Sequence, residues 1–105
     1  MNTIRIMARA QIHPGKLEAF SETAAACLAA TRRDPGTQSY EWYLNADRSE
    51  CVELAVYDDS NAVLAHLGNL GDLFGQLMAV SDLTIEVFGD PSPELRQVGA
   101  SVGAK

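Results

Sequence analysis

The sequence predicts an α+β fold of the ferredoxin-like, split βαβ type, with a four-stranded antiparallel sheet and helices on one face. Two observations lead to this prediction. Apolar residues alternate with a period of two in four segments, and they recur at helical spacing in the regions between them. The order is strand, helix, strand, strand, helix, strand, which defines the split βαβ arrangement. At 105 residues, the chain is expected to form one domain.

The first strand is predicted over residues 3–13, where isoleucine and alanine alternate with Arg, Met and Gln. A helix is predicted to follow, because Leu17, Phe20 and Cys27 recur at helical spacing. This helix is expected to end near Arg33, since Asp34-Pro35-Gly36 cannot continue it.

The segment 37–57 is predicted to be a hairpin of two strands, 37–44 and 51–57, joined by a polar turn. It contains the only Trp and all three Tyr of the chain. These aromatic residues are expected either to pack in a core or to line a pocket. Neighbours in a strand face opposite ways, so Trp42 and Tyr43 cannot both face one pocket without a bulge.

A second helix is predicted to start at Asp58-Asp59-Ser60, whose side chains offer capping oxygens. Gly68 and Gly71 weaken it, so the helical region is expected to be broken, with a short second piece over 72–79. Residues 81–89 alternate again and are predicted to be the fourth strand. Residues 1–90 are thus expected to form the domain, followed by a tail, 91–105, that forms a short helical turn or contacts a partner.

Composition excludes several classes of function. The formal net charge of −6, with scattered Lys and Arg, argues against nucleic-acid binding. No run of apolar residues is long enough to span a membrane, and the start of the chain does not resemble a signal peptide, so a cytoplasmic location is expected. Cys27 and Cys51 are expected to be buried and reduced. No spacing is typical of a metal site or a dinucleotide fingerprint, so neither metal nor cofactor is expected.

The predicted sheet has one face without helices. Arg5, Met7, Arg9 and Gln11 are expected on it, together with alternate residues of the other strands. A second sheet with a complementary face would bury this surface. A face-to-face homodimer is therefore predicted, since isologous dimers are the commonest assembly.

Three segments of the chain follow one another in a characteristic order and spacing. They are Pro14-Gly15-Lys16-Leu17-Glu18-Ala19-Phe20, Pro35-Gly36 leading into Ser39-Tyr40-Glu41-Trp42-Tyr43, and Tyr57-Asp58-Asp59 with Ala62 and His66 four apart. Together they resemble the antibiotic biosynthesis monooxygenase domain family over roughly residues 3–90. The resemblance implies a dimeric α/β barrel. It also implies that the characterised enzymes oxygenate quinols or polycyclic phenols without metal or organic cofactor, with the substrate between sheet and helices.

The sequence departs from related sequences in the third strand. These often carry Glu two residues before the aromatic residue that ends that strand, where this chain has Ala55, and Glu53 lies on the same strand face. A haem-degrading branch of the superfamily relies on an Asn in the first strand and a Trp in the second helix. Ala8 and His66 stand at those positions here, which argues against haem degradation.

His66 is the candidate catalytic base, because an imidazole titrates near neutral pH and its helical neighbours are apolar. The alternative is a structural histidine bonded to a carbonyl group. The candidate substrate-binding residues are Trp42, Tyr43, Tyr57, Phe74 and Met78. Trp42 and Tyr43 are equally compatible with the core or a dimer interface, and Phe74 and Met78 with the pocket wall or the core.

Two functions remain open at this point. One is a cofactor-independent monooxygenase that oxidises a quinol or related phenolic compound with O2. The other is a non-catalytic module that binds or protects a small aromatic molecule in the same pocket. The sequence favours the first only through the family resemblance, since one fold hosts many chemistries.

Overall fold

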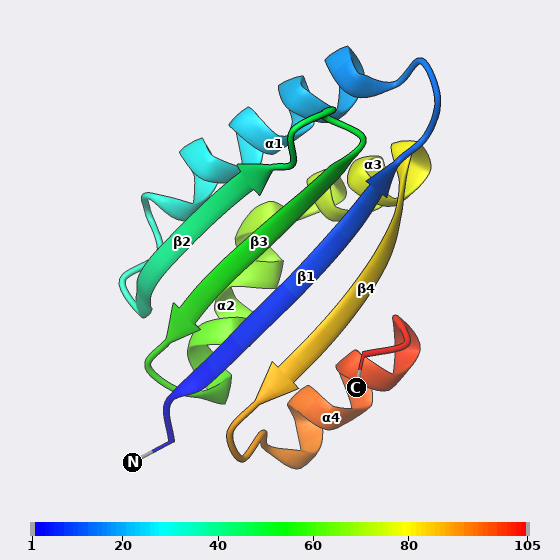
Figure 1. Ribbon diagram of the computed structural model, residues 1–105. Helices are drawn as coiled ribbons and strands as arrows, with labels where there is room; N and C mark the ends of the chain where they lie inside the picture. The colour runs from blue at the N-terminus through cyan, green and yellow to red at the C-terminus, as the bar shows by residue number, and fades with distance from the viewer. Residues whose placement is uncertain (1, 105) are drawn as a thin grey trace.

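The computed structural model describes residues 2–104, and it has the predicted ferredoxin-like fold (Figure 1). Its sheet has the strand order β2-β3-β1-β4, and every neighbouring pair is antiparallel. In chain order the elements are β1 (Ile4–Ile12), α1 (Leu17–Thr31), β2 (Thr37–Leu44), β3 (Glu50–Tyr57), α2 (Ser60–Leu70), α3 (Asp72–Val80), β4 (Ser81–Phe88) and α4 (Pro93–Ser101).

The helix boundaries follow the local chemistry of the sequence. The Asp59 carboxylate accepts a hydrogen bond from the backbone N–H of Ala62 at 2.8 Å and caps α2, as the capping sequence predicted. The break between α2 and α3 is also confirmed. It lies at Gly71, whose φ of 53° is readily adopted only by a residue without a side chain.

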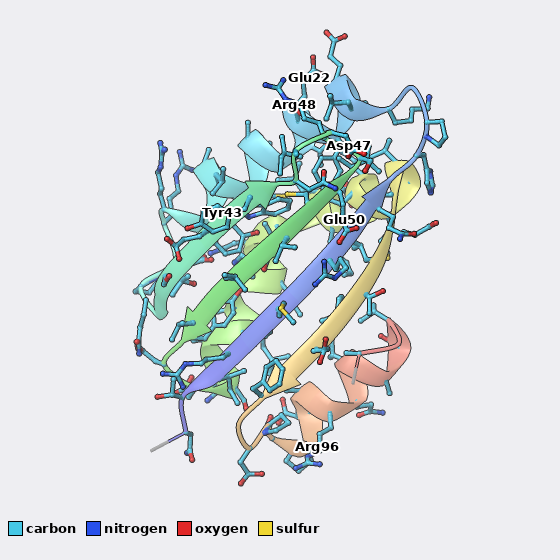
Figure 2. All side chains as sticks on the ribbon, in the orientation of Figure 1. Glu22, Tyr43, Asp47, Arg48, Glu50 and Arg96 are labelled. Carbon is cyan, nitrogen blue, oxygen red and sulfur yellow. The ribbon has the colours of Figure 1, made fainter. Side chains whose placement is uncertain are left out.

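The helices α1, α2 and α3 cover one face of the sheet, and the other face is open (Figure 1). Because side chains alternate along a strand, each strand contributes to both faces. Tyr40, Trp42 and Glu53 point to the covered face, whereas Tyr43 and Leu54 lie on the open face. Figure 2 views the molecule from the open face, with the helices behind the sheet.

The covered face carries two clusters of buried apolar residues. One lies around Phe20, Cys27 and Leu77, and the other around Ile4, Tyr57 and Leu95. The second cluster includes a residue of α4, which is a complete nine-residue helix capped by the Ser92 hydroxyl at 3.2 Å from the Leu95 nitrogen. The last helix is thus longer than the single turn that the sequence indicated, and it is anchored in the core.

The turn between α1 and β2 comes very close to α2. A Cβ atom added to Gly36 would lie 2.5 Å from the Cβ of Ala62, closer than two carbon atoms can approach. The carbonyl of Gly36 also accepts a hydrogen bond from the N–H of Asp58 at 2.9 Å. The turn is therefore fixed against the start of α2, which determines where its other residues lie.

Candidate active site

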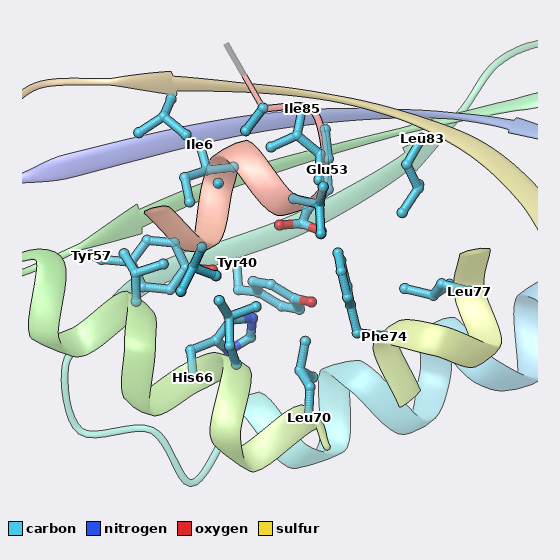
Figure 3. Close-up of a pocket in the computed structure, with 18 of the residues that line it drawn as sticks. Ile6, Tyr40, Glu53, Tyr57, His66, Leu70, Phe74, Leu77, Leu83 and Ile85 are labelled. Carbon is cyan, nitrogen blue, oxygen red and sulfur yellow. The ribbon is translucent and has the colours of Figure 1, made fainter. Parts of the chain in front are cut away.

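A cavity of about 270 Å³ lies between the covered face of the sheet and the helices (Figure 3). Its wall is mostly apolar, with residues from all four strands and from α2, α3 and α4. The strands contribute Ile6, Ala8, Tyr40, Trp42, Glu53, Tyr57, Leu83 and Ile85, and the helices Val63, His66, Leu70, Phe74, Leu77 and Leu95, among others. An apolar wall with a few polar groups is typical of a small-molecule site.

His66, on α2, is a buried residue of this wall. Its Nδ1 atom lies 2.6 Å from the Oδ2 atom of Asp34, which is also buried. The amide of Asn69 donates a hydrogen bond to the other oxygen of the Asp34 carboxyl group. Asp34 belongs to the turn that Gly36 fixes against α2, so the fold sets the position of this pair in advance.

The surroundings of His66 favour a neutral imidazole. Burial lowers the pKa of His66 from its usual value of 6.5, and the hydrogen bond and charge of Asp34 partly oppose this shift. In the neutral ring, the Nδ1–H group donates to Asp34, which leaves the Nε2 lone pair free to accept a proton. The ring centroids of Tyr40 and Tyr57 lie 5.0 and 5.3 Å from that of His66. His66 therefore has the arrangement of an oriented general base.

Glu53, on β3, is a second ionisable residue in the wall of the cavity. It lies opposite Ala8 of β1 and Trp42 of β2 in the sheet register. Burial raises the pKa of the Glu53 carboxyl group to about 7. Burial, with a smaller contribution from Glu53, also raises the pKa of the Cys27 thiol to about 11 and the pKa of Tyr40 and Tyr57. Burial thus favours the uncharged form of each of these groups.

The structure brings most of the predicted site residues together. Trp42, Tyr57, Phe74 and His66 all line the cavity. Tyr43 does not, because it lies on the open face, where its hydroxyl donates to Glu41 at 2.9 Å.

Met78 is also absent from the cavity wall and is 44% exposed. It follows Leu77, which does line the cavity, and one helical step rotates a side chain by about 100°.

Sequence reasoning missed three residues of the site as candidates. Asp34 was interpreted only as the end of a helix, and nothing in its spacing from His66 indicates a contact. Tyr40 could have been found, because it shares its strand parity with Trp42. For Glu53 the sequence indicates only the strand face that it shares with Ala55, and the structure gives it no ion-pair partner among the described residues.

The described residues contain no group of three or more His, Cys, Asp or Glu side chains arranged to hold a metal ion. No helix in residues 2–104 is long and apolar enough to cross a membrane.

The profile of the family described as antibiotic biosynthesis monooxygenase matches residues 3–73. The chain belongs to this family. The matched segment contains Asp34, Glu53 and His66, whereas β4 and α4 lie outside it. No curated protein matches the chain.

Several solved structures share the fold of this chain over most of their own length. MupZ from Pseudomonas fluorescens superposes with a TM-score of 0.86 at 25% identity, over 100% of this chain and 88% of MupZ. SnoaB from Streptomyces nogalater, a cofactor-independent oxygenase, gives 0.74 at 23% identity, over 88% and 96%. Rv0793 from Mycobacterium tuberculosis gives 0.77 at 22% identity, over 87% and 97%.

Proposed function

We propose that this protein is a cofactor-independent monooxygenase that oxidises a quinol or a related phenolic compound with O2. The observation that carries the proposal is the buried pair of Asp34 and His66 in the wall of an apolar cavity. Membership of the antibiotic biosynthesis monooxygenase family supports the same class of reaction.

Oxygenation without a cofactor needs an electron-rich substrate, because triplet oxygen reacts slowly with closed-shell molecules. A phenolate or quinol anion meets this need, so the protein must remove a proton from a bound phenol. The Nε2 atom of His66 can accept that proton, while Asp34 holds the ring in place and stabilises the imidazolium that forms. Tyr40, Trp42 and Phe74 offer aromatic surfaces for the substrate ring.

The size of the cavity limits the substrate. A dry cavity of about 150 Å³ holds one benzene molecule in another protein. The cavity of about 270 Å³ therefore suits a compound of one or two aromatic rings rather than a larger polycycle.

The open face of the sheet supports the proposal that the protein is a homodimer. Tyr43, Leu54 and Phe88 come from three different strands and are 53%, 41% and 50% exposed. Met7 pairs with Leu54 in the register, and Arg and Glu side chains share the same face. An isologous contact between two such faces would bury the apolar residues and pair charges of opposite sign.

Oxygen uptake tests the proposed activity. The protein is incubated with a panel of hydroquinones and naphthoquinols, and boiled protein serves as the control because these compounds also oxidise unaided. We expect uptake well above the control, and one labelled oxygen atom in the product when ¹⁸O₂ is supplied. Tight binding of a quinol with no oxygen uptake would instead identify a non-catalytic binding module.

A further inference from the structure

Glu53 lies in the wall of the cavity opposite His66. Figure 3 shows its carboxyl group directed from the sheet into the cavity, with α2 and His66 on the other side, and Tyr40 and Phe74 also line this cavity. Both groups therefore belong to the wall of the same cavity. The reaction proposed above uses His66 and assigns no role to Glu53.

The surroundings of Glu53 provide no cation. The ionisable groups near it are Cys51 and Tyr57 on its own strand, Tyr40 on β2, Cys27 on α1 and, across the cavity, His66 on α2. The cavity wall contains no Lys or Arg among residues 2–104, and no side chain there forms an ion pair with Glu53. Glu53 is half-buried in the wall of the cavity, and a carboxyl group withdrawn from water without a charged partner is held more easily as the neutral acid.

We propose that Glu53 is a second catalytic residue, which donates a proton to the peroxide formed when O2 adds to the substrate. This inference rests on the proposed function. It gives the cavity an acid on the sheet and a base on α2, with the substrate ring between them.

The protons and electrons of this step balance. His66 takes the phenol O–H proton, and the ring transfers two electrons in all to O2 as a C–O bond forms, which leaves a peroxide anion on a ring carbon. Glu53 protonates the outer oxygen and, as a carboxylate, then takes the C–H proton from the same carbon. The C–H electron pair forms the new C=O bond, the O–O bond breaks, and the leaving hydroxide takes the proton from His66. The products are a quinone with one added oxygen atom and water, and both residues return to their starting states.

The ionisation of the two residues fits these roles. His66 must be neutral to act as a base, and burial lowers its pKa from 6.5. Glu53 must be protonated to act as an acid, and burial raises its pKa to about 7. Both conditions hold together between the two pKa values, so activity should rise as His66 loses its proton and fall as Glu53 loses its own.

The test compares the wild type with Glu53→Gln, which keeps the shape of the side chain but cannot act as an acid. Glu22→Gln is the matched control, because it makes the same change on the exposed surface of α1 (Figure 2). Oxygen uptake with a quinol that the wild type oxidises is measured from about pH 5 to pH 9. We expect Glu53→Gln to lower turnover about 100-fold or more at pH 6.5 and to abolish the fall in activity near pH 7.

A second measurement needs no substrate. In the folded protein the pKa of Glu53 is raised from its usual value of 4.5 to about 7. The stability that Glu53 contributes to the wild type should therefore fall as the pH rises between these two values. Glu53→Gln cannot titrate, so its melting temperature relative to the wild type should increase over that range. The Glu22→Gln protein should show no such trend.

The outcomes separate the two proposals. No oxygen uptake by the wild type would overturn the proposed function, and the role of Glu53 in it. Wild-type uptake with an unchanged rate and pH profile in Glu53→Gln would overturn only the inference about Glu53. The inference about Glu53 would be supported if Glu53→Gln lost turnover, lost the fall in activity near pH 7, and gained melting temperature relative to the wild type as the pH rises.

Discussion

The two faces of the sheet are built from alternate residues of the same strands, yet the glutamate side chains on them have different surroundings. On the open face, Arg9 pairs with Glu50, and Glu41 accepts a hydrogen bond from Tyr43. On the covered face, Glu53 has no charged partner, and its pKa is raised to about 7. The residue type is the same, but the glutamates on the open face have polar partners, whereas burial disfavours the charged form of Glu53 on the covered face. Position along a strand thus decides which glutamates are suited to acid–base chemistry.

The same contrast between buried and exposed ionisable groups applies to the two histidines, and it gives the largest expected effect. We predict that His66→Gln, which keeps a donor for Asp34, lowers oxygen-dependent turnover by about two to four orders of magnitude, because the general base is lost. His13 is the control, since it also contacts an aspartate, Asp82 at 2.9 Å, but lies at the surface. His13→Gln should keep wild-type turnover. Equal rates in the two variants would show that His66 is structural.

The next effect concerns stability. Asp34→Ala leaves the buried Nδ1–H group of His66 without an acceptor and also removes the acceptor of the Asn69 amide, so we predict a loss of about 2–4 kcal/mol in the free energy of unfolding. Asp82→Ala removes the acceptor of the exposed pair with His13 and should cost less than about 1 kcal/mol. Urea unfolding of both variants measures the difference. Losses of similar size would contradict the assigned difference in burial.

The smallest of the three effects tests the open face. If two copies associate through it, Leu54→Ala should weaken the dimer about tenfold, equivalent to about 1.4 kcal/mol, because it removes apolar area from the contact. Met78→Ala is the control, since Met78 is exposed to a similar degree on α3, on the other side of the sheet. Light scattering over a range of concentrations measures both. A wild-type protein that stays at 11.3 kDa at micromolar concentration would exclude the dimer.

The fold could be predicted because its signals are local. The alternation in 3–13 and 81–89, the capping sequence before α2 and the glycine break after it each depend on neighbouring residues. The orientation of β3 was harder to predict. Val52, Leu54 and Val56 form the more apolar row, but the structure places Glu53, Ala55 and Tyr57 on the covered face. A strand with one side on a cavity and the other on an exposed apolar surface gives no clear amphipathic signal.

The site was predicted only in part, because its decisive contact is non-local. His66 could be recognised from its residue type and its apolar neighbours, but its partner Asp34 lies 32 residues earlier, in a turn. Periodicity indicates which residues share a face of one element and gives no distance between elements. The contribution of α4 to the cavity wall was missed for the same reason, since Leu95 and Val98 lie in a tail that reads as turn chemistry.

The close approach of Gly36 to α2 affects the contact between Asp34 and His66. Asp34 lies two residues before Gly36, and His66 lies one helical turn after Ala62, the residue that a Cβ at position 36 would strike. A methyl group at position 36 would push the turn away from α2 and lengthen the contact between the Asp34 carboxylate and the His66 imidazole. The absence of a side chain at Gly36 therefore allows the short contact between Asp34 and His66, for a reason of spacing rather than of backbone conformation.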